Sequence, residues 1–78
     1  MTTPLARAMG DLDEATAVRA VEEKLAAGES ALSILEELQA GMNIVGERFE
    51  EGEYYLSELI YAADIFKKAG TPLQEELK

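Results

Sequence analysis

The residue types of this 78-residue chain best suited to chemistry are acidic, and four glutamates cluster mid-sequence, at Glu47, Glu50, Glu51 and Glu53. Grouped carboxylates can bind a divalent cation or act as an acid–base pair. Helical metal centres of the di-iron type pair inward glutamates with histidine, and the chain contains no histidine. On a helix these carboxylates also fall largely on the face opposite Val45 and Phe49. We therefore expect a solvated acidic face rather than a metal or acid–base site.

Two further pairs of glutamates occupy adjacent positions, Glu22 with Glu23 and Glu36 with Glu37. Adjacent residues on a helix point about 100° apart, so both members of a pair cannot enter the same core. We expect all four carboxylates to lie in solvent, where they favour solubility.

Three tyrosines are the remaining candidates for a polar contact with a ligand, namely Tyr54, Tyr55 and Tyr61. Each phenol could form a hydrogen bond to a bound molecule. Two of them precede a predicted helix and the third lies within it. This placement favours packing beneath the connection between two helices over ligand binding.

Missing residue types exclude several function classes. Without cysteine or histidine, the chain has no thiolate metal site, cysteine nucleophile or imidazole base.

Its 16 acidic and 7 basic residues give a net charge of -9, which repels nucleic-acid phosphates and anionic lipids. The longest apolar run, Leu59 to Ala63, is too short to span a membrane, and residues 1–10 lack the apolar stretch of a signal peptide. We expect a cytoplasmic protein that binds neither nucleic acid nor membrane.

The elements that position these residues are predicted to be helices. Glycines and capping residues divide the chain into helix-length pieces, and no piece shows the two-residue alternation of a strand. Thr3 and the proline after it predict a short first helix that ends at Gly10. We expect Asp11 to open the second helix, with Glu14 reaching back in a capping box, and Gly28 to close it.

A long third helix is expected to begin after Ser30 and to end near Gly52. Its apolar stripe, at spacings of three and four residues, consists of Ile34, Leu35, Leu38, Met42, Val45 and Phe49. Gly41 and Gly46 lie inside this helix, where each costs about 0.5–1 kcal/mol relative to alanine. We interpret them as places where a neighbouring helix or ligand approaches closely, with a helix kink as the alternative.

A fourth helix is expected to begin at Ser57 and to end at Gly70. Its predicted inward side chains are Leu59, Ile60, Ala63, Phe66 and Ala69. The threonine–proline pair after Gly70 repeats the signal that starts the first helix, so residues 71–78 are expected to be a linker or the start of a following helix. The predicted architecture is an all-α four-helix bundle, with residues 1–70 as one domain and no catalytic constellation.

The central string GMNIVGERFEEGEYYLSELIYAADIFKKA, residues 41–69, is distinctive. It contains the pattern Gly-Met-x-x-Val-Gly at residues 41–46. The pattern is followed by six further distinctive residues, namely Phe49, Gly52, Glu53, Tyr55, Leu56 and Glu58. With this spacing the chain resembles the helical cap module that precedes the cobalamin domain in corrinoid methyl-carrier proteins and cobalamin-dependent methionine synthase. Residues 5–38 resemble the same module, so the resemblance covers nearly the whole chain.

In that family the module is a four-helix cap over the upper face of the corrin and its methyl group. By position in the motif, the three apolar side chains with this role correspond to Phe49, Leu56 and Leu59. An apolar lid of this kind excludes water from a labile cobalt–carbon bond. The alternative is that these three side chains belong to the core of the bundle.

The resemblance also implies partners. The family's α/β cobalamin domain supplies the lower imidazole ligand from an Asp-x-His-x-x-Gly sequence, which this histidine-free chain lacks. The resemblance therefore implies that this chain contacts cobalamin only from the upper face of the corrin. The implied partners are a separate α/β cobalamin-binding domain, in cis or in trans, and a methyltransferase protein. Ser57 stands where the family often has proline, another residue that starts helices. The implied function is a non-enzymatic cap of a corrinoid methyl carrier, active during methyl transfer from a methylated small molecule such as a methylamine or methanol.

A second hypothesis is a stand-alone helical bundle that self-associates or docks to a partner and does not bind corrin. An isolated cap would expose its apolar lid, so a homodimer is expected when the cobalamin domain is missing. An autonomous enzyme is disfavoured, because the sequence has neither histidine nor cysteine and its pattern shows no convergent polar pocket.

Overall fold

The computed structural model describes residues 3–77, and these residues form four helices. The elements are α1 (Pro4–Gly10), α2 (Glu14–Ala26), α3 (Ala31–Glu50) and α4 (Leu56–Glu76). No strand occurs between residues 3 and 77, and the predicted all-α four-helix architecture is confirmed.

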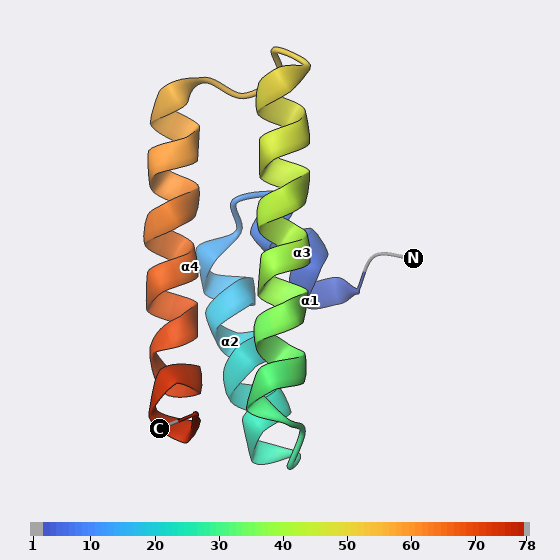
Figure 1. Cartoon of the computed structure of the whole chain (residues 1–78), viewed down its shortest axis with the longest axis vertical. Helices are drawn as coiled ribbons and strands as arrows, with labels where there is room; N and C mark the ends of the chain where they lie inside the picture. Colours follow the sequence, from blue (N-terminus) through green and yellow to red (C-terminus); the bar gives the residue numbers. More distant parts are fainter. Residues whose placement is uncertain (1–2, 78) are drawn as a thin grey trace.

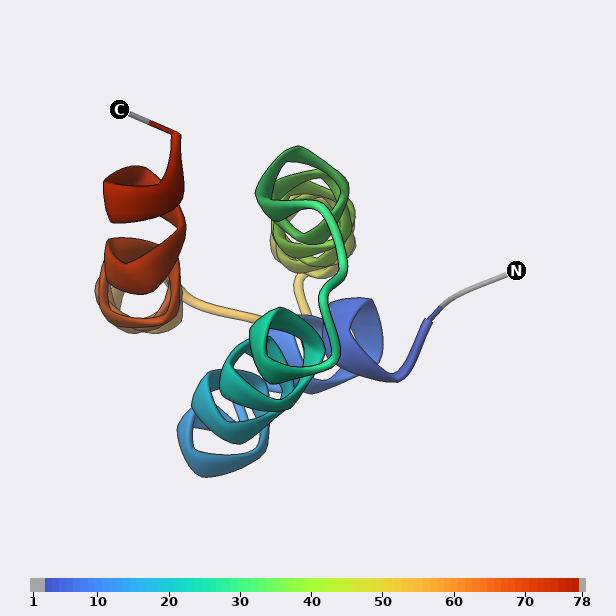
Figure 2. The same cartoon turned by 90° about the horizontal axis from the view of Figure 1, so that it is seen from below.

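The two long helices, α3 and α4, run antiparallel and side by side along the longest axis of the molecule (Figure 1). Seen from below, α1 and α2 cover one side of this pair, with α1 against α3 and α2 against α1 and α4 (Figure 2). The α3–α4 turn extends well beyond the α1–α2 turn along the long axis (Figure 1). We call the last turn of α3, residues 51–55 and the first turn of α4 the hairpin tip.

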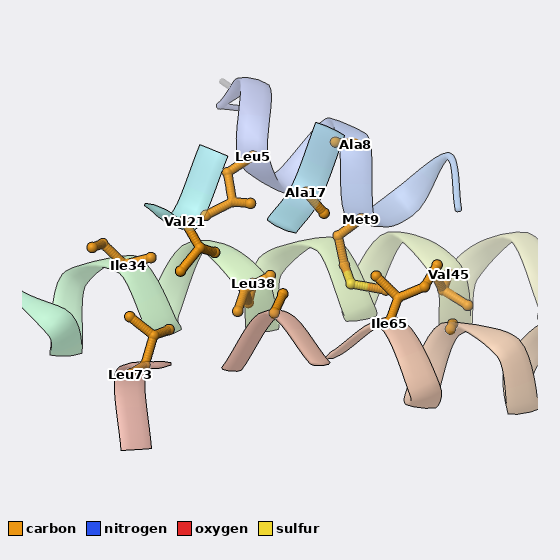
Figure 3. Packing of buried hydrophobic residues seen from close by; sticks show 12 residues of the cluster. Leu5, Ala8, Met9, Ala17, Val21, Ile34, Leu38, Val45, Ile65 and Leu73 are labelled. Atoms are coloured by element: carbon orange, nitrogen blue, oxygen red, sulfur yellow. The ribbon is translucent and has the colours of Figure 1, made fainter. Parts of the chain in front are cut away.

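All four helices contribute apolar side chains to one core, which Figure 3 shows from close by. Its large, fully buried members are Leu5, Met9, Val21, Ile34, Leu38, Val45, Ile65 and Leu73. Burial of each such side chain contributes about 1.5–3 kcal/mol, so helices that are marginal alone are held together by this cluster.

Several predicted helix ends are confirmed. The hydroxyls of Thr3 and Ser30 accept hydrogen bonds from the backbone amide three residues further on, at 3.2 and 3.4 Å. Gly28 and Gly52 follow α2 and α3 with φ angles of 87° and 81°. This left-handed conformation ends a helix and is accessible to glycine without a steric penalty.

The second helix begins two residues later than expected, so the predicted start at Asp11 is wrong. Asp13 is the N-cap, and its carboxylate accepts a hydrogen bond from the amide of Thr16 at 3.3 Å. Asp11 instead ends α1, where its amide donates to the carbonyl of Arg7 at 2.8 Å. Leu12 then takes the left-handed conformation, with φ of 60°, and reverses the chain.

The predicted start of the fourth helix at Ser57 is also wrong. Tyr55 is the N-cap residue and Leu56 is the first residue of α4. The carboxylate of Glu58 accepts a hydrogen bond from the amide of Tyr55 at 2.6 Å. A glutamate at the third helical position therefore satisfies the backbone amide of the N-cap residue.

The predicted end of this helix at Gly70 is wrong as well, because α4 continues to Glu76. Thr71 does not cap a new helix; its hydroxyl donates back to the carbonyl of Lys67 at 2.9 Å. Pro72 lies within the helix, where a proline removes one backbone hydrogen bond. Leu73, the next residue, is fully buried in the core, and its burial favours continuing the helix across the proline.

The expected division into a domain of residues 1–70 and a segment of residues 71–78 was based on a helix break that the structure does not have. Residues 71–76 belong to α4, and Lys78 lies outside the described residues. The domain division itself stays a prediction.

Apolar residues of α4 form two stripes, of which only one faces the core. The buried stripe contains Ala62, Ile65, Ala69 and Leu73. Ala69 was expected there and is buried, whereas Ile60 and Ala63 are exposed, so their predicted inward placement is wrong. Leu59 and Phe66 are half-buried at the boundary between the stripes.

The two glycines inside α3 have different environments. A Cβ atom added at Gly41 would lie 2.7 Å from the carbonyl oxygen of Ala6 and would overlap the side chain of Met9. The predicted close approach of a neighbouring helix is therefore confirmed at this position. At Gly46 a Cβ atom would meet nothing within 4 Å, so no part of the described chain approaches closely there.

Candidate functional site

The three apolar residues predicted to face a corrin all lie at the hairpin tip. Phe49 is in the last turn of α3, Leu56 begins α4, and Leu59 follows one turn later. Phe49 is 41% exposed and Leu56 is 64% exposed. Two large apolar side chains with this exposure are not core residues, so the alternative of core packing is wrong for them. Leu59 is half-buried and packs against the core.

Further exposed apolar residues extend this surface along α4. Leu56, Ile60 and Ala63 are separated by four and three residues, so they share one face of the helix. Ile60 is 66% exposed. The sequence pattern predicts Ile60 and Ala63 in the core because a helix with two apolar stripes does not reveal which stripe faces inward.

A shallow, open groove between α3 and α4 continues the apolar surface away from the tip. Its walls are formed by Gln39, Met42, Asn43, Ala63 and Phe66. Met42 and Phe49 are two turns apart on the same face of α3. The α3 side of the groove therefore continues toward the hairpin tip. We call the surface formed by Met42, Phe49, Leu56, Ile60, Ala63 and Phe66 the α3–α4 apolar face.

Backbone hydrogen bonds close the turn at the tip. The amide of Gly52 donates to the carbonyl of Phe49 at 3.1 Å. The amides of Glu53 and Tyr54 both donate to the carbonyl of Arg48, at 2.8 and 3.2 Å. Together with the positive φ of Gly52, these bonds turn the chain sharply after Phe49, so that α4 begins at Leu56.

The side chain of Arg48 connects this turn to the turn between α1 and α2. Its Nη1 atom lies 2.7 Å from a carboxylate oxygen of Asp11, 2.8 Å from the carbonyl oxygen of Gly10 and 2.9 Å from the hydroxyl oxygen of Tyr54. Its Nε atom lies 3.5 Å from a carboxylate oxygen of Glu53. Hydrogen bonding to Asp11, and next to Tyr54, raises the pKa of the guanidinium group above its ordinary value, so Arg48 is a permanent cation.

Tyr54 supports the same connection. Its hydroxyl donates to the carbonyl of Gly10 at 2.8 Å, and the guanidinium carbon of Arg48 lies 5.6 Å from the centre of its ring. Tyr54 is half-buried, so the prediction that it packs at the interhelix connection is confirmed. Tyr55, by contrast, is 74% exposed, and that prediction is wrong for it.

Another polar contact joins α2 and α4, through Glu14 and Tyr61. The hydroxyl of Tyr61 donates to a carboxylate oxygen of Glu14 at 3.3 Å, and Lys68 pairs with the other oxygen at 3.2 Å. Desolvation raises the pKa of the Tyr61 phenol above 10.0, and the negative charge of Glu14 adds to the effect. Glu14, expected in a capping box with Asp11, therefore bridges two helices instead.

The acidic residues are mostly exposed, as expected for Glu47, Glu50, Glu51 and Glu53. The prediction for Glu37 is wrong, because its side chain is only 16% exposed and lies 3.5 Å from the ammonium group of Lys24. Within residues 3–77 no group of three or more acidic side chains is close enough together to hold a metal ion. Among the helices of the same residues, none is both long and apolar enough to cross a membrane.

Comparisons with known proteins match the sequence of this chain to a family. The family described as B12 binding domain matches residues 2–71. Trimethylamine corrinoid protein 1 of Methanosarcina acetivorans is 35% identical over 72 residues, which cover 91% of this chain and 33% of the relative. The trimethylamine corrinoid protein of Methanosarcina barkeri is 36% identical over 75 residues, covering 91% of this chain and 35% of the relative.

This chain therefore spans about a third of the length of the curated relatives it matches. No solved structure matches it significantly. The family match covers most of the chain and includes α1, α2, α3 and the greater part of α4, with the hairpin tip and the α3–α4 apolar face. The chain belongs to the B12 binding domain family and has the helical fold of a corrinoid-protein cap module.

Proposed function

We propose that this chain is a cap that covers the upper face of methylcobalamin in a corrinoid methyl carrier, with Phe49, Leu56 and Leu59 as the contact residues. The observation that carries the proposal is the exposure of Phe49 and Leu56, two large apolar side chains, at the hairpin tip of a chain that belongs to this family. Exposed apolar side chains gain about 25 cal/mol for each Å² they bury against another apolar surface.

The chain's own residues suit contact with a corrin but not coordination of cobalt. The hairpin tip offers an apolar surface, and the chain has no histidine that could serve as an axial ligand. When bound, the cofactor would supply the methyl–cobalt bond that undergoes transfer. The apolar side chains of the tip would exclude water from the methyl group and control access to it.

The proposed partners are an α/β cobalamin-binding domain, which would hold the corrin from below, and a methyltransferase protein. This chain would act as a non-catalytic part of that system, with a methylated small molecule as the methyl donor. Support comes from the relatives, which are named trimethylamine corrinoid proteins and are about three times as long as the region they share with this chain. The cytoplasmic location expected from the sequence stays a prediction.

A stand-alone interaction module that forms a homodimer is the second candidate function. The same exposed residues favour it, because exposed apolar side chains on a small protein tend to become covered by association. The two candidates differ in what covers the tip: a corrin in the first case and a second copy of the chain in the other.

The test measures protection of methylcobalamin from light. The chain is mixed with the α/β cobalamin-binding part of a trimethylamine corrinoid protein loaded with methylcobalamin, and loss of the methyl–cobalt absorbance under illumination is followed. We expect the chain to slow photolysis several-fold, and Phe49→Ala and Leu56→Ala to remove most of this protection. Leu32→Ala is the matched control, because Leu32 is also exposed on α3 but lies about 25 Å from Phe49 along the helix.

Equal photolysis rates with and without the chain, in a mixture where complex formation is demonstrated by size, would contradict the proposed cap function. Equal loss of protection in the Leu32→Ala control would also contradict it, because protection would then not depend on the tip.

A further inference from the structure

The hairpin tip is joined to the rest of the bundle through Arg48 and Tyr54. Where the tip extends beyond the α1–α2 turn, no other described helix lies beside it (Figure 1). Arg48 reaches back to Gly10 and Asp11, and Tyr54 reaches Gly10 by its own hydroxyl group. These contacts link segments that are 37 to 44 residues apart in the sequence.

This link has more hydrogen bonds than an ordinary surface ion pair, which contributes little to stability. The acceptor at its centre is the carbonyl oxygen of Gly10, which receives hydrogen bonds from both Arg48 and Tyr54. This carbonyl lies at the C-terminal end of α1, where the helix dipole favours a cation. The Tyr54 ring beneath the guanidinium and the half-buried setting of both side chains restrict their movement.

Arg48 also holds the tip through its backbone. Its carbonyl oxygen accepts hydrogen bonds from the amides of Glu53 and Tyr54. Phe49 is the next residue in the chain. One residue is thereby bonded to the α1–α2 turn through its side chain and to the α3–α4 turn through its backbone. Since Phe49 and Leu56 flank the α3–α4 turn, a residue bonded to both turns is placed to hold them relative to α1 and α2.

We propose that Arg48 is a positioning residue, which with Tyr54 fixes the α3–α4 turn against the end of α1 and so holds Phe49 and Leu56 in place for contact with the corrin. The proposal rests on the proposed cap function. It assigns a role to the polar residues behind the tip, whereas the cap function concerns the apolar residues on it.

The first test measures amide hydrogen exchange in the full chain. Arg48→Lys keeps the charge, but its ammonium nitrogen lies one bond closer to the backbone than Nη1 and the Nε contact with Glu53 is lost. Tyr54→Phe loses only the hydroxyl group. We expect either variant to speed exchange at the Glu53 and Tyr54 positions about tenfold, because the turn opens more often without these hydrogen bonds. Core amides such as that of Leu38 should exchange within about twofold of the wild-type rate, which shows that the bundle remains folded.

Arg19→Lys is the matched control, because Arg19 is exposed on α2, away from the hairpin tip. It should leave exchange at the turn unchanged. Unchanged exchange at the turn in both Arg48→Lys and Tyr54→Phe would overturn the proposal, because the link would then not hold the turn.

The second test measures photolysis of methylcobalamin in the mixture with the cobalamin-binding part, as for the cap function. Arg48→Lys should lose about half or more of the protection while Tm changes by only a few degrees, a combination that a purely structural role would not produce. Full protection with a loosened turn would overturn the positioning role alone, provided that Phe49→Ala loses protection in the same assay. If Phe49→Ala also keeps full protection, the cap function fails, and the positioning proposal fails with it.

Discussion

Gly41 of α3 lies directly against Met9 of α1, and this contact sets how closely the two helices approach. A Cβ atom at position 41 would overlap the Met9 side chain and lie 2.7 Å from the Ala6 carbonyl oxygen, a backbone atom that cannot rotate away. Met9 is fully buried in the core. The absence of a side chain at Gly41 is therefore what allows Met9 to reach the interior.

We expect Gly41→Ala to lower the free energy of unfolding by about 2 kcal/mol or more, because overpacking forces α1 away from α3. Gly46→Ala, in the same helix but with open space around its Cβ position, should raise it by about 0.5–1 kcal/mol through helix propensity. Urea unfolding followed by circular dichroism measures both. A stabilising or neutral Gly41→Ala substitution would contradict the described packing of α1 on α3.

Truncation at the tip should have a smaller effect on stability than truncation in the core. In the chain without cofactor, Leu56→Ala should lower the free energy of unfolding by about 1 kcal/mol or less and Phe49→Ala by about 1–2 kcal/mol, because the two residues are 64% and 41% exposed and neither is buried in the core. Leu38→Ala should cost about 2–5 kcal/mol, because Leu38 is fully buried. A cost for Phe49→Ala as large as that for Leu38→Ala would identify Phe49 as a core residue.

Self-association of the isolated chain should depend on the α3–α4 apolar face. We expect sedimentation at high micromolar concentration to show a dimer, because Leu56 and Ile60 lose unfavourable contact with water when a second copy covers them. Leu56→Glu should shift the dimer toward monomer, whereas Leu32→Glu, at the other end of α3, should not. A strict monomer under these conditions would show that the exposed face does not bind its own copy.

Stability should fall at alkaline pH through the contacts of Glu14. The pKa of Lys68 is raised above 10.5 by its hydrogen bonds to Glu14 and Asp64, and that of Tyr61 is raised above 10.0. Both folded-state pKa values exceed the unfolded ones, so the stabilisation is fully present below pH 10 and is lost as the pH rises through the folded values. The double variant Tyr61→Phe, Lys68→Met should show a shallower decline of Tm above pH 10. An identical decline in the wild type and the double variant would exclude these two groups as its cause.

The chain alone should bind cobalamin weakly, because the tip offers one apolar surface and no ligand to cobalt. We expect a Kd weaker than about 1 μM, which corresponds to about 8 kcal/mol of binding free energy. Titration of methylcobalamin with the chain, followed by absorbance, measures this affinity. A sub-micromolar complex would show that the main binding determinants lie within these 78 residues.

Local sequence signals predicted the number of helices and several of their ends. Thr3, Ser30 and the glycines at positions 28 and 52 act within a single turn of backbone, so the residues that decide the outcome are adjacent in the sequence. The apolar periodicity of α3 does not predict that Phe49 is exposed, because a residue at this position of the stripe fits the core equally well. Its placement at the tip was implied by the resemblance of the central string to a family.

Two of the helix boundaries that were wrongly predicted from the sequence depend on contacts between distant residues. Asp11 resembles a helix start, but Arg48 binds it from α3, and Asp13 caps α2 instead. Gly70 resembles a helix end, but burial of Leu73 against the other helices favours continuing α4. Such contacts have no signature in local spacing, and the link from Arg48 to the α1–α2 turn could not be predicted for the same reason.

The measurement that tests the central claim most directly is magnetisation transfer from the methyl group on cobalt. Methylcobalamin carrying a ¹³C-labelled methyl group is loaded on the cobalamin-binding part of a trimethylamine corrinoid protein and mixed with this chain, and nuclear Overhauser effects from the labelled methyl protons are recorded. We predict signals to the ring of Phe49 and the methyl groups of Leu56 and Leu59, and none to Leu32. Signals that bypass the hairpin tip and reach α2, or no signal in a complex shown to form, would contradict the assignment of this surface as the lid over the corrin.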